Sequence, residues 1–152
     1  MRAVRRAIVA DPADRAARSA RIWARIVDLA DLRPGRRVLL FESLPSEPET
    51  GAWFAWCRDH DVAVFAPAVD GSDLRVEPGD LDPALLDVVV VPGLAFTSDG
   101  RRLGQGGGHY DRFLPRLRPG CLTIGAAFAE QLVDELPTED HDAKVSTVVT
   151  DA

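Results

Sequence analysis

The chain has 152 residues, of which 46% are apolar and 28% charged, and its formal net charge is −6. We expect a single domain over residues 1–152, because this length supports one core and this composition excludes extensive disorder. The longest apolar stretch, near residues 88–96, is too short to span a membrane. The net negative charge disfavours a broad nucleic-acid-binding surface.

The two cysteines and the first residues of the chain favour a reduced, cytoplasmic protein. Cys57 and Cys121 are isolated and have no CxxC spacing, and no apolar signal region follows the first arginines. Residues 1–40 contain ten arginines against four aspartates, a net +6, whereas the remainder has a net charge of −12. This arginine-rich start is interpreted either as a solvated helix face or as a set of contacts to an anionic ligand.

Helix and strand signals alternate in the first half of the chain. Residues 11–14 (DPAD) are typical of a helix start, and residues 33–35 (RPG) predict where that helix ends. We expect a strand over 37–41, a helix over 50–60 and a second strand over 62–67.

The second half begins with a polar, turn-rich segment, residues 70–83, which we expect to be a connection without regular structure. Residues 86–92 (LDVVVVP) form a β-branched run that predicts a central parallel strand covered on both faces. Further elements are then expected as a helix over 109–117, a strand over 121–127, a helix over 130–136 and a strand over 145–150. The alternation predicts an α/β fold with a mostly parallel sheet flanked by helices.

A glycine-rich loop follows the strongest predicted strand. Four of the five residues 104–108 are glycine, within the segment RRLGQGGGHYDRF at 101–113. Ordering glycine costs more chain entropy than ordering other residues, but glycines also let several backbone N–H groups face one phosphate. Arg101 and Arg102 are candidates for phosphate contacts, and Asp111 is a candidate ligand of Mg²⁺. A glycine turn that binds nothing is the weaker interpretation, although the loop is no P-loop and matches GxGxxG only loosely.

The segment VVVVPGLAFTSDGRRLGQGGGHYDRFL, residues 88–114, resembles the signature of the 5-formyltetrahydrofolate cyclo-ligase family. That family's pattern is an apolar strand ending in P-G-x-x-F, followed by G-x-R-L-G-x-G-x-G-[YF]-Y-D. FESLPSEPET at 41–50 and FAEQLVDELPTEDHD at 128–142 resemble two further segments of the family, and DRAARSARI at 14–22 fits its first helix.

This resemblance implies a NagB/RpiA/CoA-transferase-like α/β fold and a reaction that consumes ATP. In the family's reaction, Mg²⁺-ATP phosphorylates the formyl oxygen of 5-formyltetrahydrofolate, and ring closure gives 5,10-methenyltetrahydrofolate. The expected ligands are therefore ATP, Mg²⁺ and a reduced folate.

The resemblance also assigns roles to individual positions. Arg102 and Tyr110 would be catalytic, Glu47 would bind the pterin, and Asp111 and Asp142 would hold Mg²⁺. The nucleotide phosphates would be wrapped by Arg102, Leu103, Gly104, Gln105, Gly106, Gly107, Gly108, His109 and Tyr110.

Two features differ from the family pattern. Its usual K-x-x-x-R opening, which contacts ATP and folate, has no match here, so this N-terminal segment is expected either upstream of residue 1 or lost. The connection over 69–83 is shorter than usual. Because of these differences, the alternative to an active enzyme is a non-catalytic relative that binds nucleotide or folate. A third interpretation is an RNA-associated relative.

Overall fold

The computed structural model of the chain describes residues 2–137, 139 and 142–152, so three residues of the segment 128–142 lie outside the description. Within these residues the α-helices are α1 (Arg2–Ala10), α2 (Pro12–Ala30), α3 (Gly51–Asp59) and α4 (His109–Phe113). The strands are β1 (Arg37–Leu39), β2 (Ala63–Asp70), β3 (Asp73–Glu77), β4 (Val88–Val91), β5 (Ala95–Phe96), β6 (Arg102–Leu103), β7 (Leu122–Ala126) and β8 (Thr147–Val149). Three short 3₁₀ turns are η1 (Pro83–Leu85), η2 (Leu114–Arg116) and η3 (Ala129–Gln131).

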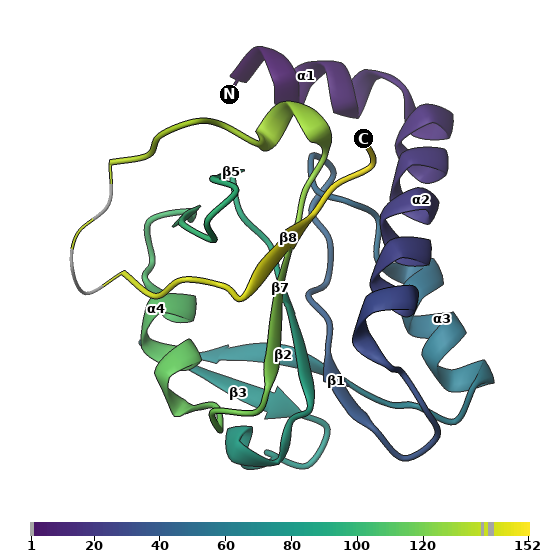
Figure 1. Ribbon diagram of the computed structural model, residues 1–152, viewed down its shortest axis with the longest axis vertical. Coiled ribbons are helices and arrows are strands. Elements are labelled where there is room, and N and C mark those ends of the chain that lie inside the picture. The colour runs from purple at the N-terminus through teal and green to yellow at the C-terminus, as the bar shows by residue number, and fades with distance from the viewer. Residues whose placement is uncertain (1, 138, 140–141) are drawn as a thin grey trace.

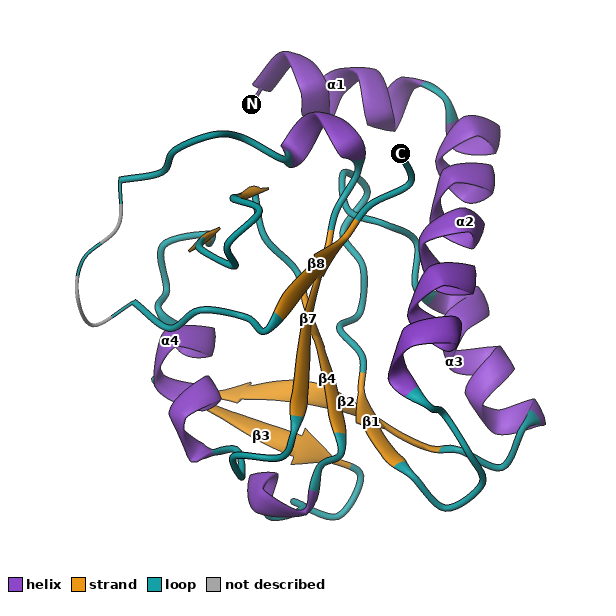
Figure 2. Ribbon diagram, viewed as in Figure 1, coloured by secondary structure: helices purple, strands orange, loops and turns teal. Residues whose placement is uncertain are grey.

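Six strands form one sheet in the order β3-β2-β1-β4-β7-β8. All neighbours from β2 to β8 are parallel, and only β3 runs antiparallel to its neighbour β2. Strands β5 and β6 form a separate antiparallel pair. Helices α2 and α3 lie together on one side of the sheet and α4 on the other (Figures 1 and 2). The predicted α/β fold with a mostly parallel sheet is confirmed.

Strand β4 is the centre of the core, as its β-branched run predicted. All four of its valines are buried. Val88 and Val90 pack in the apolar layer beneath α2 and α3, whereas Val89 and Val91 pack in the layer beneath α4. Since successive side chains of a strand alternate between faces, a strand covered on both faces needs apolar residues at every position.

Helix α2 begins where the sequence predicted. The Asp11 side chain accepts a hydrogen bond from the Asp14 backbone N–H (3.0 Å), and Pro12 occupies the first turn. On its inner face Trp23 stacks on Trp53 of α3, with ring centroids 5.2 Å apart. These tryptophans are therefore core residues, consistent with their helical spacing in the sequence.

The prediction that residues 70–83 lack regular structure was wrong. This segment contains β3, which pairs with β2 through a tight turn at Gly71 and Ser72. Within β3 the buried Leu74 and Val76 alternate with polar residues, which is the pattern of a strand with one face in the core. Gly71-Ser72, with φ of +62° at the glycine, is the two-residue hairpin signal that indicates this turn.

The helix predicted over 130–136 is also absent, because tertiary hydrogen bonds extend the chain after one 3₁₀ turn. The Gln131 side chain donates to the Gly93 and Leu94 carbonyls (3.1 and 3.2 Å). The Val133 N–H donates to the Phe96 carbonyl (2.8 Å), so this stretch lies along β5. Among the described residues, no helix has the length and apolar character needed to cross a membrane.

Candidate functional site

The sheet reverses its winding between β1 and β4, since β2 lies on one side of β1 and β4 on the other. In open α/β sheets, ligands bind beyond the carboxyl ends of the strands at such a position. A cavity of about 590 Å³, the main pocket, lies there and is lined by Phe41 and Glu42 after β1 and by Pro92 and Gly93 after β4. This volume suits a nucleotide or a substrate of similar size.

Every residue that the resemblance assigns to a ligand lines the main pocket. They are Glu47, Arg102, Leu103, Gly104, Gln105, Gly106, Gly107, Gly108, His109, Tyr110, Asp111 and Asp142. They come from three segments that are far apart in the sequence: the loop after β1, the glycine loop and the segment before β8. Arg101 does not line the pocket; it forms an ion pair with Asp99 (3.4 Å) at the turn between β5 and β6.

The β5–β6 hairpin fixes the start of the glycine loop. Phe96 pairs with Arg102 and Ala95 with Leu103, and the Leu94 N–H donates to the Leu103 carbonyl (2.7 Å). The loop then runs through residues 104–108 into α4. Gly106 and Gly108 have φ of +100° and +69°, which side-chain-bearing residues rarely adopt.

Three glycines of the loop leave room for basic side chains. A Cβ atom on Gly104 would lie 2.6 Å from Arg102 Nη1, and one on Gly107 would lie 2.6 Å from His109 Nδ1. A Cβ atom on Gly108 would lie 2.8 Å from Arg112 Nη1. The glycine content therefore lets three basic side chains lie directly against the backbone that faces the pocket.

Arg102 is a partly buried cation that lines the main pocket. Its guanidinium lies 5.1 Å above the centroid of the Tyr110 ring, and its buried Nε has no hydrogen-bond partner within the described structure. Burial lowers the pKa of Arg102, while the charges of Asp111 and other pocket residues act to raise it. Arginine remains protonated at neutral pH, so a desolvated positive charge is available to an anionic ligand.

Glu47, on the loop after β1, is a buried carboxylate that lines the main pocket and is only 5% exposed. Its Oε1 accepts a hydrogen bond from the Leu44 N–H (2.8 Å), and its backbone carbonyl accepts one from Arg15 Nε of α2 (2.8 Å). Burial raises the pKa of Glu47, although the Leu44 hydrogen bond and the charges of Arg15, Arg102 and Arg5 act to lower it.

Tyr110 lies beneath Arg102 at the start of α4 and also lines the pocket. Burial raises the pKa of its phenol well above the ordinary value. The hydroxyl is therefore neutral at physiological pH and able to donate a hydrogen bond to a ligand.

Asp111 and Asp142, the two carboxylates that the resemblance assigns to a metal ion, both line the main pocket. The Ala143 N–H donates to Asp111 Oδ1 (3.2 Å), which brings the Asp111 side chain next to the residue that follows Asp142. Among the described residues, no cluster of three or more potential metal ligands exists. Two carboxylates nevertheless fit Mg²⁺, which commonly takes one or two from the protein and the rest of its ligands from phosphates and water.

Arg112 is a residue of the site that sequence reasoning missed. Its Nη2 donates to the Gly107 carbonyl (2.7 Å), and its Nε donates to the Ser72 carbonyl at the tip of the β2–β3 hairpin (2.8 Å). His109 Nε2 lies 3.2 Å from the neighbouring Gly71 carbonyl. The hairpin tip is thus bound to the glycine loop, a contact that the sequence could have indicated only if β3 had been recognised.

Comparison with known sequences identifies relatives for the half of the chain that carries this loop. Residues 75–151 match the 5-formyltetrahydrofolate cyclo-ligase family. The chain is 41% identical to 5-formyltetrahydrofolate cyclo-ligase of Mus musculus over 83 residues, covering 51% of this chain and 39% of that protein. It is 44% identical to the Escherichia coli K12 protein of the same name over 90 residues, covering 59% and 46% of the two chains. The match thus spans less than half the length of each relative.

Comparison with solved structures extends the likeness to the whole fold. A 5,10-methenyltetrahydrofolate synthetase from Mycoplasma pneumoniae superposes with a TM-score of 0.83 at 22% identity, covering 99% of this chain and 98% of that one. The NMR structure of the Aquifex aeolicus 5,10-methenyltetrahydrofolate synthetase gives a TM-score of 0.78 at 24% identity, covering 97% and 88%. At these identities the superpositions establish a shared fold.

Proposed function

Because the chain belongs to the 5-formyltetrahydrofolate cyclo-ligase family, we propose that it converts 5-formyltetrahydrofolate to 5,10-methenyltetrahydrofolate with consumption of ATP. The observation that most supports this proposal is the main pocket, in which three separate segments of the family pattern meet. A partly buried arginine, a buried glutamate and two aspartates line one cavity of a size that suits a nucleotide or similar ligand.

In the proposed reaction the substrate supplies its own nucleophile. The formyl oxygen attacks the γ-phosphorus of ATP, the bond from that phosphorus to the bridging oxygen breaks, and ADP leaves. N10 of the folate then attacks the activated formyl carbon and loses its proton, while inorganic phosphate departs with the former formyl oxygen. The protein needs no nucleophilic side chain, only groups that position two ligands and offset phosphate charge.

The glycine loop and Arg102 are assigned to the phosphates. Backbone N–H groups of residues 104–108 are close to the pocket because no side chains intervene at the four glycines, and such groups bind phosphate oxygens. Arg102 supplies a partly buried positive charge, and its attraction to the transferred phosphoryl group strengthens as negative charge develops there. Tyr110, which stays protonated, is assigned as a hydrogen-bond donor near the formyl oxygen.

Glu47 is assigned to the pterin. Its Oε1 is engaged by the Leu44 N–H, whereas Oε2 forms no hydrogen bond within the described structure. A buried carboxylate oxygen of this kind is a strong acceptor for the N–H groups of a pterin ring.

Asp111 and Asp142 are assigned to Mg²⁺. When bound, the ion offsets the negative charge of the triphosphate and orients its terminal phosphate. The Ala143 N–H donates to one oxygen of Asp111 and so helps to hold this side chain, which lines the main pocket.

The proposal predicts that Asp111→Asn abolishes turnover while leaving the fold intact. The measurement is the absorbance of methenyltetrahydrofolate formed by purified protein from 5-formyltetrahydrofolate and Mg²⁺-ATP. We expect a loss of about a hundredfold or more in kcat, because one charged ligand is replaced by a neutral amide. The matched control is Asp134→Asn, which removes an exposed carboxylate outside the pocket.

Equal activity of the Asp111 and Asp134 variants would remove the metal role assigned to Asp111. If the wild-type chain binds ATP in calorimetry but forms no product, the alternative of a non-catalytic binding protein is supported instead. Absence of both binding and turnover would overturn both functions.

A further inference from the structure

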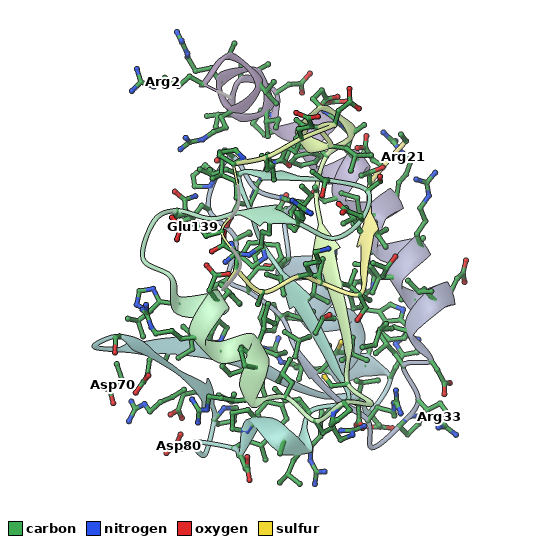
Figure 3. The ribbon with its side chains drawn as sticks, turned by 60° about the vertical axis from the view of Figure 1, so that its left-hand side comes forward. Arg2, Arg21, Arg33, Asp70, Asp80 and Glu139 are labelled. Atoms are coloured by element: carbon green, nitrogen blue, oxygen red, sulfur yellow. The ribbon has the colours of Figure 1, made fainter. Side chains whose placement is uncertain are left out.

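Gln131 is a buried polar side chain that does not line the main pocket and has no role in the proposed reaction as described so far. It is only 2% exposed and belongs to η3, which follows β7. The chain after β7 passes beside β5 (Figure 1). This segment then reaches the main pocket, which Pro137 and Asp142 line, and Figure 3 shows Glu139 on the same side of the molecule as Asp70 at the end of β2.

Both the nitrogen and the oxygen of the Gln131 side-chain amide form hydrogen bonds. Nε2 donates to the Gly93 and Leu94 carbonyls (3.1 and 3.2 Å), and Oε1 accepts from the Phe128 N–H (2.9 Å). Because a carbonyl only accepts and a backbone N–H only donates, these partners determine the orientation of the amide. A carboxylate at this position would face two carbonyl oxygens with no proton to donate.

The peptide between Gly93 and Leu94 connects Gln131 to the strand that carries Arg102. The carbonyl of this peptide accepts from Gln131, and its N–H, on Leu94, donates to the Leu103 carbonyl (2.7 Å). In a trans peptide these two groups point in opposite directions, so one planar unit is held on one side by Gln131 and on the other by β6. Gln131 therefore helps to fix the backbone next to Arg102.

The Arg102 side chain contacts the same turn, residues 92–94. A Cβ atom on Gly93 would lie 3.0 Å from Arg102 Cγ, so the stem of the arginine lies against the glycine backbone. Arg102 Nη1 donates to the Pro92 carbonyl (3.3 Å). Residues 92–94 thus support Arg102 along its length, and Gln131 holds them from outside the main pocket.

We propose that Gln131 is a positioning residue of the reaction, which sets the place of Arg102 in the main pocket by holding residues 92–94. This inference rests on the proposed function, in which Arg102 offsets charge on the transferred phosphoryl group. A displacement of about 1 Å in a reacting or charged group costs a large part of its contribution to the rate. Loss of the Gln131 hydrogen bonds should therefore impair the use of ATP and spare the folate, which is assigned to Glu47.

The first test is Gln131→Met, which removes these hydrogen bonds with little change in side-chain volume. We expect kcat/KM for ATP to fall about tenfold, with KM for 5-formyltetrahydrofolate unchanged. The matched control is Thr123→Val, which removes the hydrogen bonds of Thr123 Oγ1 with the Ser146 N–H (2.7 Å) and hydroxyl (2.9 Å) outside the main pocket. Rates are measured under conditions in which urea unfolding shows both variants to be folded.

A second variant, Gln131→Glu, tests hydrogen bonding separately from shape. A protonated carboxyl can donate to the Gly93 carbonyl and accept from the Phe128 N–H, and burial favours this neutral form. We expect Gln131→Glu to be more active than Gln131→Met at pH of about 6 and to lose this advantage as the pH rises and the carboxyl ionises. Arg18, 4.7 Å from the Phe128 ring centroid, and Arg102 stay protonated over this range. Each rate is divided by the wild-type rate at the same pH.

Wild-type kinetics in Gln131→Met, or an equal loss in Thr123→Val, would overturn the inference. So would equal impairment of Gln131→Glu and Gln131→Met at every pH. If the wild-type chain itself forms no product, the proposed function fails, and amide hydrogen exchange tests the positioning alone. The Leu94 N–H should then exchange faster in Gln131→Met than in Thr123→Val, and equal exchange at Leu94 overturns the inference.

Discussion

At the scale of single residues, the glycines of the loop and its basic side chains depend on each other. Gly104 lies so close to the Arg102 guanidinium that any side chain at this position would displace it. Among the described residues the Nε of Arg102 has no partner, its Nη1 donates to the Pro92 carbonyl (3.3 Å), and its guanidinium packs over Tyr110. Gly104 therefore contributes to the proposed phosphate binding because its missing side chain leaves room for the Arg102 guanidinium.

We accordingly predict that Gly104→Ala weakens ATP binding by about tenfold, the effect of losing one charge-assisted hydrogen bond. The expected signature is a rise in the KM for ATP with little change in the KM for the folate, measured by steady-state kinetics. Gly51→Ala is the matched control, since a Cβ atom there would meet nothing within 4 Å. An ATP KM that stays at the wild-type value would show that Arg102 does not depend on Gly104.

Most of the pocket residues could be predicted because they lie in one long ordered motif, residues 88–114, whereas Glu47 and Asp142 belong to two separate segments. Arg101 illustrates the limit of that reasoning: adjacent to Arg102, it has the same chemistry but pairs with Asp99 in the turn. Strand pairing directs the two neighbouring side chains to opposite sides of the β5–β6 hairpin. The motif alone does not distinguish Arg101 from Arg102. The β5–β6 hairpin determines that Arg102 lines the pocket and Arg101 does not.

At the scale of elements, the β2–β3 hairpin supports the glycine loop. Arg112 joins the Ser72 carbonyl at the hairpin tip to the Gly107 carbonyl of the loop. In a trans peptide the C=O and N–H groups point in opposite directions, so fixing the Gly107 carbonyl also fixes the Gly108 N–H. We infer that Arg112 is a positioning residue for the phosphate-facing backbone.

Arg112→Gln should therefore loosen both segments without unfolding the protein. We expect faster amide hydrogen exchange at residues 70–73 and 104–108 in the ligand-free protein, together with an ATP KM raised about tenfold. Arg116→Gln, which changes an exposed arginine just beyond α4, is the control and should alter neither quantity. Exchange that stays slow at both segments would contradict the coupling.

Elements were predictable where local pattern and tertiary environment agree. The valine run of β4 predicted a strand buried on both faces, and Asp11 and Pro12 predicted the start of α2. Residues 130–136 have helical composition, but the Gln131 side chain donates hydrogen bonds to the Gly93 and Leu94 carbonyls. A prediction from neighbouring residues alone cannot include partners so far away in the sequence. Strand β3 was missed because its many polar residues concealed the alternation of Leu74 and Val76.

At the scale of the whole molecule, α2 ties the loop that carries Glu47 to the end of the chain. Arg15 Nε donates to the Glu47 carbonyl, and Arg18 Nε donates to Asp151 Oδ2 (2.7 Å) beyond β8. Asp151 also accepts a hydrogen bond from the Ala129 N–H (2.8 Å). One helix thus holds both the loop that carries Glu47 and the end of the chain after β8.

This arrangement makes stability depend on pH through Asp151. Burial acts to raise the pKa of Asp151, but the hydrogen bonds from Arg18 and the Ala129 N–H outweigh burial. The pKa of Asp151 in the folded protein therefore lies below its ordinary value. The ionised carboxylate therefore stabilises the fold above pH of about 4, and this contribution disappears as the pH falls through the lowered pKa.

Asp151→Asn should cost about 2 kcal/mol of unfolding free energy at pH 7, the scale of a charge-assisted hydrogen bond. The difference from wild type should shrink below pH of about 4, which urea unfolding at several pH values measures. Asp28→Asn, an exposed carboxylate on α2, is expected to change stability little at any pH. A cost for Asp151→Asn that is the same at neutral and acidic pH would contradict this account.

The most direct test of the ligand assignment is a crystal structure with Mg²⁺ and a non-hydrolysable ATP analogue. We predict phosphate oxygens within hydrogen-bonding distance of the backbone N–H groups of residues 104–108, with Arg102 beside them and Mg²⁺ bound to Asp111. Phosphates bound elsewhere, with the glycine loop vacant and Asp111 facing bulk water, would contradict it.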